Sequence, residues 1–239
     1  MDPAAFAGMN AIEDRHWWFV ARRAIIDKLI TGLALPQDAR ILEAGCGTGG
    51  NLAMLSRHGS LAAFEFDDAA RAIAAKKRIC PIVAGHLPDA IGATDDNFDL
   101  IAMLDVLEHI DDDVGSLAAL GRRLATTGRL LVTVPAIPAL WSAHDVLHHH
   151  RRRYTKKSLQ AAVSAAGLRI DRIGYFNSLL FPIAAAQRLA AKVLGWKEPV
   201  DAVPAVPVNA VLRTVFAAER HIVGRRGFPI GLSLYAIIR

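Results

Sequence analysis

The sequence predicts an α/β fold, in which a mostly parallel sheet of seven strands carries helices on both faces. Short apolar stretches alternate with longer amphipathic stretches along most of the chain, and a glycine-rich turn follows the first apolar stretch. This alternation is typical of parallel sheets, because two parallel neighbours need a long crossover, usually a helix, between them. Hydrophobic residues make up 53% of the 239 residues, which is enough for a sizeable core.

The predicted elements follow one another in order along the chain. Apolar runs bounded by glycine, proline or charged residues predict strands at residues 40–45, 61–66, 81–85, 98–105, 129–135, 168–176 and 232–239. Amphipathic periodicity predicts helices at residues 10–33, 49–59, 67–79, 111–128 and 155–167. The last helix starts with a threonine, a residue type that caps helices. Helix 67–79 has acids in its first turn and bases in its last turn, as the helix dipole favours.

We expect a single domain over residues 1–239. Its parts are an N-terminal lid helix (1–36), a core (37–176), a helical insertion (177–230) and a final strand (231–239). The insertion mixes apolar and basic residues, as helices that lie in a membrane interface do. Such helices can equally cover the edge of a sheet. We therefore favour a lid over the substrate and leave peripheral membrane contact open.

Features of the termini and of the cysteines indicate a compartment. The N-terminus lacks the basic start and the apolar run of a secretory signal, and no apolar run is long enough to cross a bilayer. Two cysteines make no disulfide framework. We expect a cytoplasmic protein, with membrane association left open.

Charge is unevenly distributed along the chain. Residues 1–150 hold 13 Lys and Arg against 19 Asp and Glu, a net charge of −6, whereas residues 151–239 hold 15 against 4, a net charge of +11. The basic part predicts an anionic partner, which could be a phosphorylated substrate, a membrane surface or nucleic acid. A solvated basic face would explain the same charge.

The glycine-rich turn at residues 45–50 favours a nucleoside ligand with a cationic tail. Glycines there allow positive φ angles and a close approach to the backbone, and their spacing also satisfies the G-x-G-x-x-G dinucleotide pattern. However, Glu43 would repel a pyrophosphate and would attract an amino group. Glu65, at the end of the second predicted strand, can accept both hydroxyls of a ribose. S-adenosylmethionine meets these demands.

The same residues resemble a known family. Residues 43–49, EAGCGTG, resemble the E/D-x-G-x-G-x-G motif of class I S-adenosylmethionine-dependent methyltransferases, and residues 98–113 resemble the fourth strand and following loop of its small-molecule branch. The resemblance covers about residues 40–175 and the last strand, and it implies a Rossmann-like fold. Residues 16–23 and 144–155 resemble a bacterial subgroup of the family.

The resemblance implies a set of cofactor contacts. The methionine end of the cofactor would be framed by Glu43, Gly45, Cys46, Gly47 and Gly49. Glu65 would hold the ribose, Phe66 would lie against the adenine, and Asp105 would border the cofactor. His86 stands where the family usually has an acid that meets the adenine amino group, so either its imidazole or the backbone of Leu87 would serve. Trp18 and Arg22 on the leading helix would cover the sulfonium and pair with the methionine carboxylate, unless they are packing and surface residues.

Candidate catalytic residues follow the fourth and fifth predicted strands, because open α/β sheets bind ligands at the carboxyl ends of their strands. The candidates for a base and its orienting partner are His109, His144, Asp145 and His150. A helix-entry hydrogen bond with Glu108 is the alternative for His109.

A basic segment follows the fifth predicted strand and is suited to binding an anion. The candidates for acceptor binding are Arg152, Arg153 and Tyr154, because arginine grips carboxylates and phosphates by bidentate bonds. A solvated basic loop is the alternative. We expect no metal, since Arg151–Arg153 adjoin the histidines and would repel a cation.

These patterns favour a methyltransferase that acts on an oxygen of a small or lipid-linked, anionic acceptor. Two alternatives stay open: an NAD(P)-dependent oxidoreductase, and a non-catalytic protein that keeps the fold and binds a membrane or a partner. Specific nucleic-acid binding is not expected, because the segment after the fourth predicted strand reads LDVL where base methyltransferases commonly carry a Pro-Pro-aromatic motif.

Overall fold

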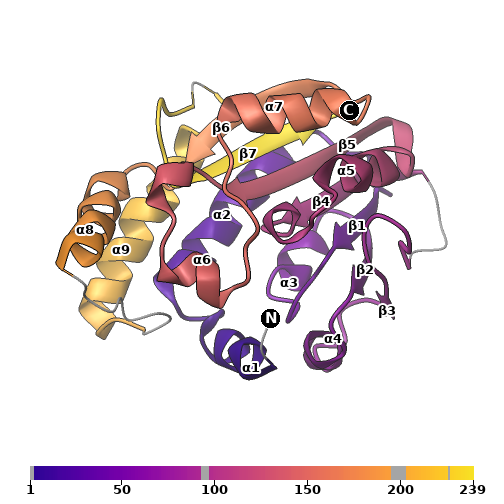
Figure 1. The fold of residues 1–239 in the computed structure, drawn as a ribbon. Helices are drawn as coiled ribbons and strands as arrows, with labels where there is room; N and C mark the ends of the chain where they lie inside the picture. Colours follow the sequence, from indigo (N-terminus) through magenta and orange to yellow (C-terminus); the bar gives the residue numbers. More distant parts are fainter. Residues whose placement is uncertain (1–2, 93–96, 195–202, 226) are drawn as a thin grey trace.

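A seven-stranded sheet forms the centre of the molecule, and the predicted fold class is confirmed (Figure 1). The computed structural model describes residues 3–92, 97–194, 203–225 and 227–239. The strand order is β3-β2-β1-β4-β5-β7-β6, and only β7 runs antiparallel to its neighbours among these strands. The strands are β1 (Arg40–Ala44), β2 (Ser60–Glu65), β3 (Ile82–Ala84), β4 (Phe98–Leu104), β5 (Leu124–Pro135), β6 (Ile170–Phe176) and β7 (Ser233–Ile238).

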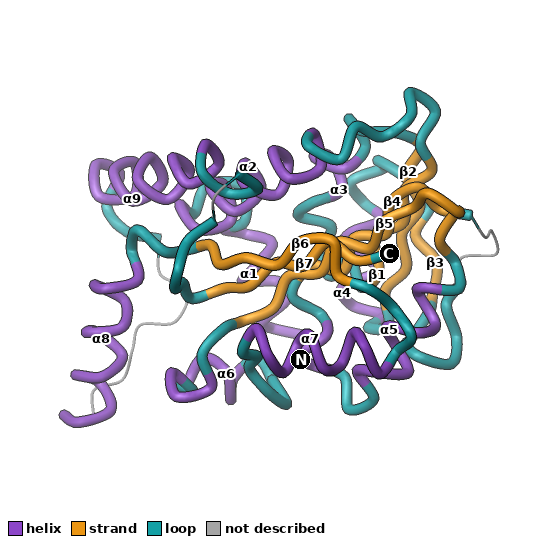
Figure 2. Tube along the Cα trace, turned by 90° about the horizontal axis from the view of Figure 1, so that it is seen from above, coloured by secondary structure: helices purple, strands orange, loops and turns teal. Residues whose placement is uncertain are grey.

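Helices cover both faces of the sheet, so that the molecule has three layers (Figure 2). Helices α2, α3 and α9 lie on one face, and α5 and α7 lie on the other. The α-helices are α1 (Pro3–Ile12), α2 (Trp17–Thr31), α3 (Leu52–Leu55), α4 (Asp68–Ala75), α5 (Asp113–Gly121), α6 (Ala143–Leu147), α7 (Lys156–Ala165), α8 (Phe181–Leu194) and α9 (Val206–Ala218). The 3₁₀ turns are η1 (Leu107–His109), η2 (Pro138–Leu140) and η3 (Glu219–His221).

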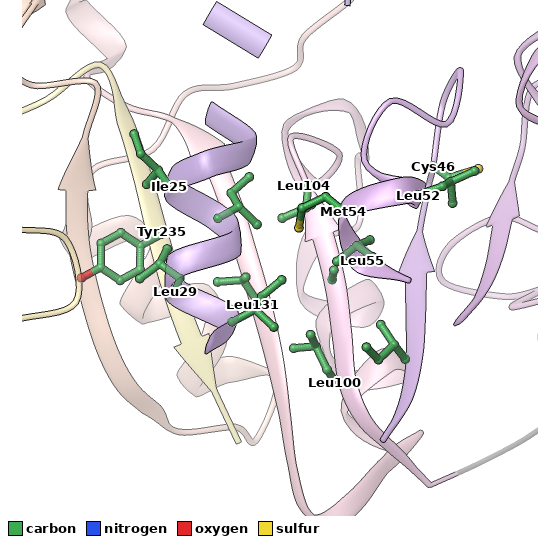
Figure 3. Close-up of a cluster of buried hydrophobic side chains, with 14 of the residues drawn as sticks. Ile25, Leu29, Cys46, Leu52, Met54, Leu55, Leu100, Leu104, Leu131 and Tyr235 are labelled. Atoms are coloured by element: carbon green, nitrogen blue, oxygen red, sulfur yellow. The ribbon is translucent and has the colours of Figure 1, made fainter. Parts of the chain in front are cut away.

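The core has two parts, one on each side of the sheet. Successive strand residues point to opposite faces, so Ile41 packs into the cluster beneath α2 and α3, while Leu42 packs into the cluster beneath α5 and α7. Figure 3 shows the first cluster, where Ile25 and Leu29 of α2 lie against Tyr235 of β7. Strands buried on both faces explain why the sequence shows continuous apolar runs there.

The N-terminal region differs from the single helix predicted at residues 10–33. The structure has two helices, α1 and α2, with a break between Ile12 and Trp17. His16 caps α2 in an extended conformation, and its ring accepts a hydrogen bond from the Trp18 amide. The break places Glu13 against the glycine-rich turn, which is a tertiary contact that helical periodicity does not contain.

Three other predicted helices are shorter in the structure. The helix predicted at 111–128 ends at Gly121, and residues from Leu124 onward belong to β5, which pairs with the first residue of β4. Strand pairing overrides local propensity here, and Gly128 fits because a Cβ at that position would lie 2.4 Å from the Phe98 carbonyl oxygen. The helices predicted at 49–59 and 67–79 shrink to α3 and α4.

The predicted insertion forms α8, α9 and η3, and α9 is part of the core. Its Phe216 is fully buried and packs edge-to-face on Trp17 of α2, with ring centroids 5.9 Å apart. Asn209 accepts a hydrogen bond from the Trp17 amide at 2.8 Å. The buried Glu219 of η3 accepts the amides of Ser178 and Leu179, which joins the start of the insertion to its end.

Among the described residues, no helix has the length and apolar character needed to cross a membrane.

Candidate active site

The glycine-rich turn lies between β1 and α3, at the carboxyl edge of the sheet. Gly45, Gly47 and Gly49 adopt positive φ angles of 73°, 54° and 82°, which explains the need for glycine at these positions. The amides of Gly45 and Cys46 donate to the Phe64 carbonyl and attach the turn to β2. The Cys46 side chain is buried in the core, and burial raises the pKa of its thiol. Cys46 therefore contributes its backbone to the turn.

Glu43 is a buried carboxylate with one oxygen bonded and one oxygen without a partner. Its Oε1 accepts a hydrogen bond from Asn51 Nδ2 at 2.9 Å, while Oε2 has no hydrogen-bond partner among the described residues. Burial raises the pKa of this carboxyl group to about 8, and the charges of Glu65 and Glu13 act in the same direction. An ammonium group would satisfy Oε2 and would stabilise the ionised form.

Glu65 ends β2 and holds the turn from the other side. Its Oε2 accepts the Gly47 amide at 2.7 Å, and its Oε1 accepts the Asp67 amide at 2.9 Å. An ionised carboxylate has about four acceptor positions. Glu65 can therefore order the turn and still accept hydroxyl groups from a ribose.

Phe66, next in the chain, projects into solvent with 73% of its surface exposed. Its ring meets His86 edge-on, with centroids 6.0 Å apart. The His86 backbone forms a bridge with Ala90, and Leu87 packs against the core beneath α5 and α7. An exposed aromatic ring beside Glu65 is suited to lie against an adenine. The predicted roles of His86 and Leu87 stay predictions.

Arg22 of α2 reaches the ends of β4 and β5. Its Nη2 pairs with Asp105 Oδ2 at 2.6 Å and donates to Thr133 Oγ1 at 2.9 Å, and its guanidinium lies 5.4 Å from the ring centre of Trp18. Thr133 also donates to Asp105 at 3.2 Å. Arg22 Nε is buried without a hydrogen-bond partner among the described residues. The structure thus brings Trp18, Arg22 and Asp105 together, while their roles toward the cofactor stay predictions.

Glu13 was not predicted at the site. Thr48 Oγ1 donates to its Oε2 at 2.7 Å, and Lys77 forms an ion pair with its Oε1. Gly50 lies so close that a Cβ there would be 2.5 Å from Glu13 Oε2. Glu13 thereby fastens the segment between α1 and α2 to the glycine-rich turn. No sequence signal marks it, because an acid between two helices is usually solvated.

These residues fit S-adenosylmethionine, the cofactor that the sequence predicts. Among the described residues, Glu43 Oε2 and Arg22 Nε are buried polar atoms without a hydrogen-bond partner, and they match the ammonium and carboxylate groups at the methionine end. A Cβ built at Gly47 would meet no atom within 4 Å. The turn therefore leaves space next to Gly47, where a ligand can approach the backbone because glycine has no side chain.

A second group of side chains lies at the carboxyl ends of β4 and β5. Glu108, His109 and His150 offer one ligand atom each, and these atoms all lie within 4.8 Å of one another. The rings of His109 and His150 meet edge-on with centroids 4.7 Å apart. Burial, together with the charges of His150 and His148, lowers the pKa of His109 to about 3.

Glu108, which the sequence suggests only as a hydrogen-bond partner of His109, belongs to this group. Its side chain is 1% exposed, and Oε2 has no hydrogen-bond partner among the described residues. Burial raises its pKa well above the ordinary value, with a further contribution from the charge of Asp105. A sequence signal was available, because the LEH tripeptide at residues 107–109 is separated by only two residues from the buried end of β4.

Asp145 organises the other side of this group. It is 0% exposed and accepts from Arg153 Nε and Nη2, both at 2.8 Å, and from His150 Nδ1 at 2.9 Å. Burial alone would raise the pKa of Asp145, but the bonds from His150 and Arg153 outweigh it and lower the pKa. The predicted pairing of a histidine with an orienting acid is found for His150 and Asp145. The His144 backbone lies in α6, but its side chain lies outside the described residues.

The predicted acceptor residues have internal partners. The buried Arg153 is bound to Asp145 and also donates to the Ala136 carbonyl. Arg152 pairs with Asp113 at 3.0 Å, and Tyr154 donates its hydroxyl to the same carboxylate at 2.8 Å. The expectation that Arg153 binds an anionic acceptor is corrected. Its guanidinium is buried and forms its hydrogen bonds with Asp145 and the Ala136 carbonyl.

Comparisons with known proteins agree with this geometry. The chain matches the family described as methyltransferase domain over residues 17–173. No curated protein sequence matches it significantly. Among solved structures, a chain from the complex between the Haloferax volcanii Trm112 methyltransferase activator and a methyltransferase is 18% identical, with a TM-score of 0.62 and coverage of 98% of this chain and 92% of that chain.

Two further solved structures share the fold. A TehB-like SAM-dependent methyltransferase from Corynebacterium glutamicum is 19% identical, with a TM-score of 0.54 and coverage of 89% of this chain and 84% of that chain. The [4+2]-cyclase SpnF is 20% identical, with a TM-score of 0.56 and coverage of 89% of this chain and 80% of that chain. Identities this low show a shared fold, and one fold supports more than one reaction.

Proposed function

Because the chain belongs to the methyltransferase domain family, which it matches over residues 17–173, we propose that it methylates an oxygen atom of a small or lipid-linked acceptor. Its cofactor is S-adenosylmethionine, which supplies a methyl group already activated by a sulfonium sulfur. The family match decides against the NAD(P)-dependent oxidoreductase that the glycine spacing left open. The residues described above therefore have to bind the cofactor and the acceptor, align them, and remove a proton from the acceptor.

The observation that carries this proposal is a pair of buried atoms, Glu43 Oε2 and Arg22 Nε, for which the described part of the chain offers no hydrogen-bond partner. A buried polar atom without a hydrogen-bond partner costs free energy, and a ligand with an ammonium and a carboxylate would provide a partner for each of these two atoms. Glu65 and Phe66 lie at the same edge of the sheet, at the end of β2. Glu65 is suited to bind a ribose, and Phe66 is suited to contact an adenine. Asp105 joins this half to the acceptor half through its ion pair with Arg22.

An oxygen acceptor is supported by the group around His150. A hydroxyl must lose its proton during methyl transfer, which requires a group that can accept or displace it. Asp145 orients His150 by a 2.9 Å bond, and His109 lies against the same ring. An amine acceptor would need less help, since a neutral amine is already nucleophilic.

The insertion supports a lipid-linked or anionic acceptor. On α9, Val208 and Val211 are exposed apolar residues, and Arg213, Arg220 and Arg225 are exposed along the same region. With Arg153 committed to Asp145, these arginines are the better candidates for an anionic surface. Flotation with anionic and neutral vesicles tests this part: binding to neither, in the presence of cofactor, would contradict membrane contact.

The cofactor site is tested by isothermal titration with S-adenosylhomocysteine and, separately, with NADH. We expect binding of the former alone. Glu65→Ala should lose about 1.5–3 kcal/mol of binding free energy, because charged hydrogen bonds are removed. Asp68→Ala is the matched control, since Asp68 is an exposed acid three residues further on, at the start of α4. Equal affinities for wild type and Glu65→Ala would contradict the ribose assignment.

The reaction is tested with a labelled methyl donor and acceptor panels that differ in one group: phenol, carboxylic acid, amine and thiol on the same carbon frame. We expect label on the oxygen compounds. Label on the amine series alone would contradict an oxygen acceptor while leaving methyl transfer intact.

A further inference from the structure

Three potential ligands converge beside the cofactor site, and one of them is an unsatisfied buried acid. The ligand atoms of Glu108, His109 and His150 lie within 4.8 Å of one another. Glu108 is 1% exposed, and its Oε2 has no hydrogen-bond partner among the described residues. A buried carboxylate oxygen without a donor is costly unless a cation or a proton satisfies it.

Neighbouring groups orient the two imidazoles in the way metal sites require. His150 bonds Asp145 through Nδ1, so that Nε2 is the ring atom turned to act as a ligand. The His109 ring packs edge-on against the His150 ring, with centroids 4.7 Å apart. Metal-binding histidines usually donate their second nitrogen to a carboxylate or a carbonyl, in the manner of His150. Asp145 in turn is held by Arg153.

Arg151–Arg153 adjoin the histidines in the sequence and would repel a cation, but in the structure each of them has a carboxylate partner. Arg153 forms a bidentate pair with Asp145, and Arg152 pairs with Asp113. Arg151 is exposed and lies 3.3 Å from Asp111. Each of these cations has a carboxylate of its own, so their charges do not face the Glu108 group uncompensated.

We propose that Glu108, His109 and His150 bind a divalent transition-metal ion, with Asp145 as the positioning residue for His150. Two imidazoles and one carboxylate form a donor set that suits Zn²⁺, Mn²⁺, Fe²⁺ or Co²⁺, whereas Mg²⁺ prefers oxygen ligands alone. Ligand atoms around such an ion are about 3.3 Å apart, given metal–ligand bonds of about 2.1 Å. Side-chain rotation within the group closes the remaining distance.

Three protein ligands leave coordination positions open for an oxygen of the acceptor. The ion would lie at the carboxyl ends of β4 and β5, where Asp105 connects to the cofactor half. A bound hydroxyl would become more acidic there, as metal-bound water does. This inference rests on the proposed methylation of oxygen. It adds that the acceptor presents a metal-binding oxygen, such as one of two neighbouring hydroxyls or a hydroxyl beside a carbonyl.

The test uses the untagged full chain, freed of metal with a chelator and then dialysed. Zn²⁺ is titrated by calorimetry, and Co²⁺ is followed by the visible absorption of the bound ion. We expect one ion per chain for wild type. Glu108→Gln and His109→Asn should each weaken binding at least about tenfold. His149→Asn is the matched control: His149 is an exposed neighbour with a φ of 56°, a conformation that asparagine tolerates.

Binding of S-adenosylhomocysteine to each variant verifies folding and reads out the proposed function separately. Wild-type protein that binds S-adenosylhomocysteine but no ion would overturn the metal site. Equal ion affinity in all variants would do the same, because the ion would then sit elsewhere. Ion binding without S-adenosylhomocysteine binding would keep the metal site and contradict the cofactor assignment.

Discussion

The two halves of the active site are built by different means. The cofactor half, at the ends of β1 and β2, consists of a backbone turn with three glycines at positive φ and of side chains near the ends of these two strands, Glu43, Glu65 and Phe66. The acceptor half, at the ends of β4 and β5, consists of side chains from residues 105–109 and 145–154. A buried network centred on Asp145 holds it together.

The difference predicts how each half responds to change. Substitutions in the cofactor half should alter cofactor affinity more than stability. The turn is partly open, and among the described residues Glu43 Oε2 has no hydrogen-bond partner that a substitution would remove. Substitutions in the acceptor half should alter stability first, because removing one member leaves another buried charge unpaired. Arg22 and Asp105 connect the two halves through one ion pair.

The largest effect is expected for Arg153→Ala in the acceptor half. Asp145 is 0% exposed and would lose both bonds from the guanidinium. Breaking a buried pair from one side costs about 3–5 kcal/mol of unfolding free energy, measurable by denaturant unfolding. Arg151→Ala, at an exposed position, should cost less than about 1 kcal/mol. A similar small loss for both variants would show that the network does not hold this half.

In the cofactor half, Phe66→Ala should separate affinity from stability. The side chain is 73% exposed, so the unfolding free energy should change by less than about 0.5 kcal/mol. Loss of stacking on the adenine should cost about 1–3 kcal/mol of S-adenosylhomocysteine binding. Trp141→Ala, an exposed aromatic change on the acceptor side, should leave this affinity unchanged. An unaltered titration curve for Phe66→Ala would remove Phe66 from the site.

Gly47→Ala tests whether the turn must stay open. The built Cβ would meet no protein atom within 4 Å, so the protein loses only the cost of a φ of 54°, about 1–2 kcal/mol. S-adenosylhomocysteine affinity should fall at least tenfold, about 1.4 kcal/mol. Gly167→Ala is the matched control, with a φ of 75° and the same open surroundings after α7. If both variants bind equally well, the cofactor does not approach Gly47.

Glu43 should also make cofactor affinity depend on pH. Its pKa of about 8 means that the carboxyl group is mostly protonated at pH 7 before the cofactor binds. The cofactor's ammonium group favours the ionised form, so affinity should rise between pH 6 and pH 8, by at most about tenfold per pH unit, and should level off above. Glu43→Gln should abolish the slope. Calorimetry in two buffers at pH 7 would detect the released proton.

Glu43 also predicts how stability depends on pH. Its pKa in the folded protein lies above its ordinary value, so the folded state binds more protons. This contribution to the free energy of unfolding is present at low pH and declines as the pH rises toward about 8. Cofactor binding should offset the decline.

Much of the cofactor half could be predicted because its signals are local. The glycines follow one buried strand directly, and Glu43 lies just before them. Glu65 lies at the end of the next strand. Parallel strands bring their carboxyl ends to one edge of the sheet, so these residues were expected to lie together. Thr155 as the cap of α7 was predictable for the same reason: the cap bonds an amide three residues away.

Contacts between distant segments were not predictable in this way. Glu13 meets Thr48 and Lys77 only because the chain breaks between α1 and α2. Thr133 looked like an ordinary β-branched strand residue, yet it accepts a hydrogen bond from Arg22. Arg153 looked like a surface cation within a basic run, and its burial became clear only from its pair with Asp145.

The sequence by itself determined the fold class, the family resemblance and the cofactor edge, because periodicity and glycine geometry act over a few residues. Tertiary structure alone decided which charges are satisfied. Whether Arg153 serves an acceptor or Asp145, and whether Glu108 has a donor, depends on atoms that lie far apart in the chain. In a buried site the cost of an unpaired charge exceeds any local preference, so those pairings decide what the acceptor half can bind.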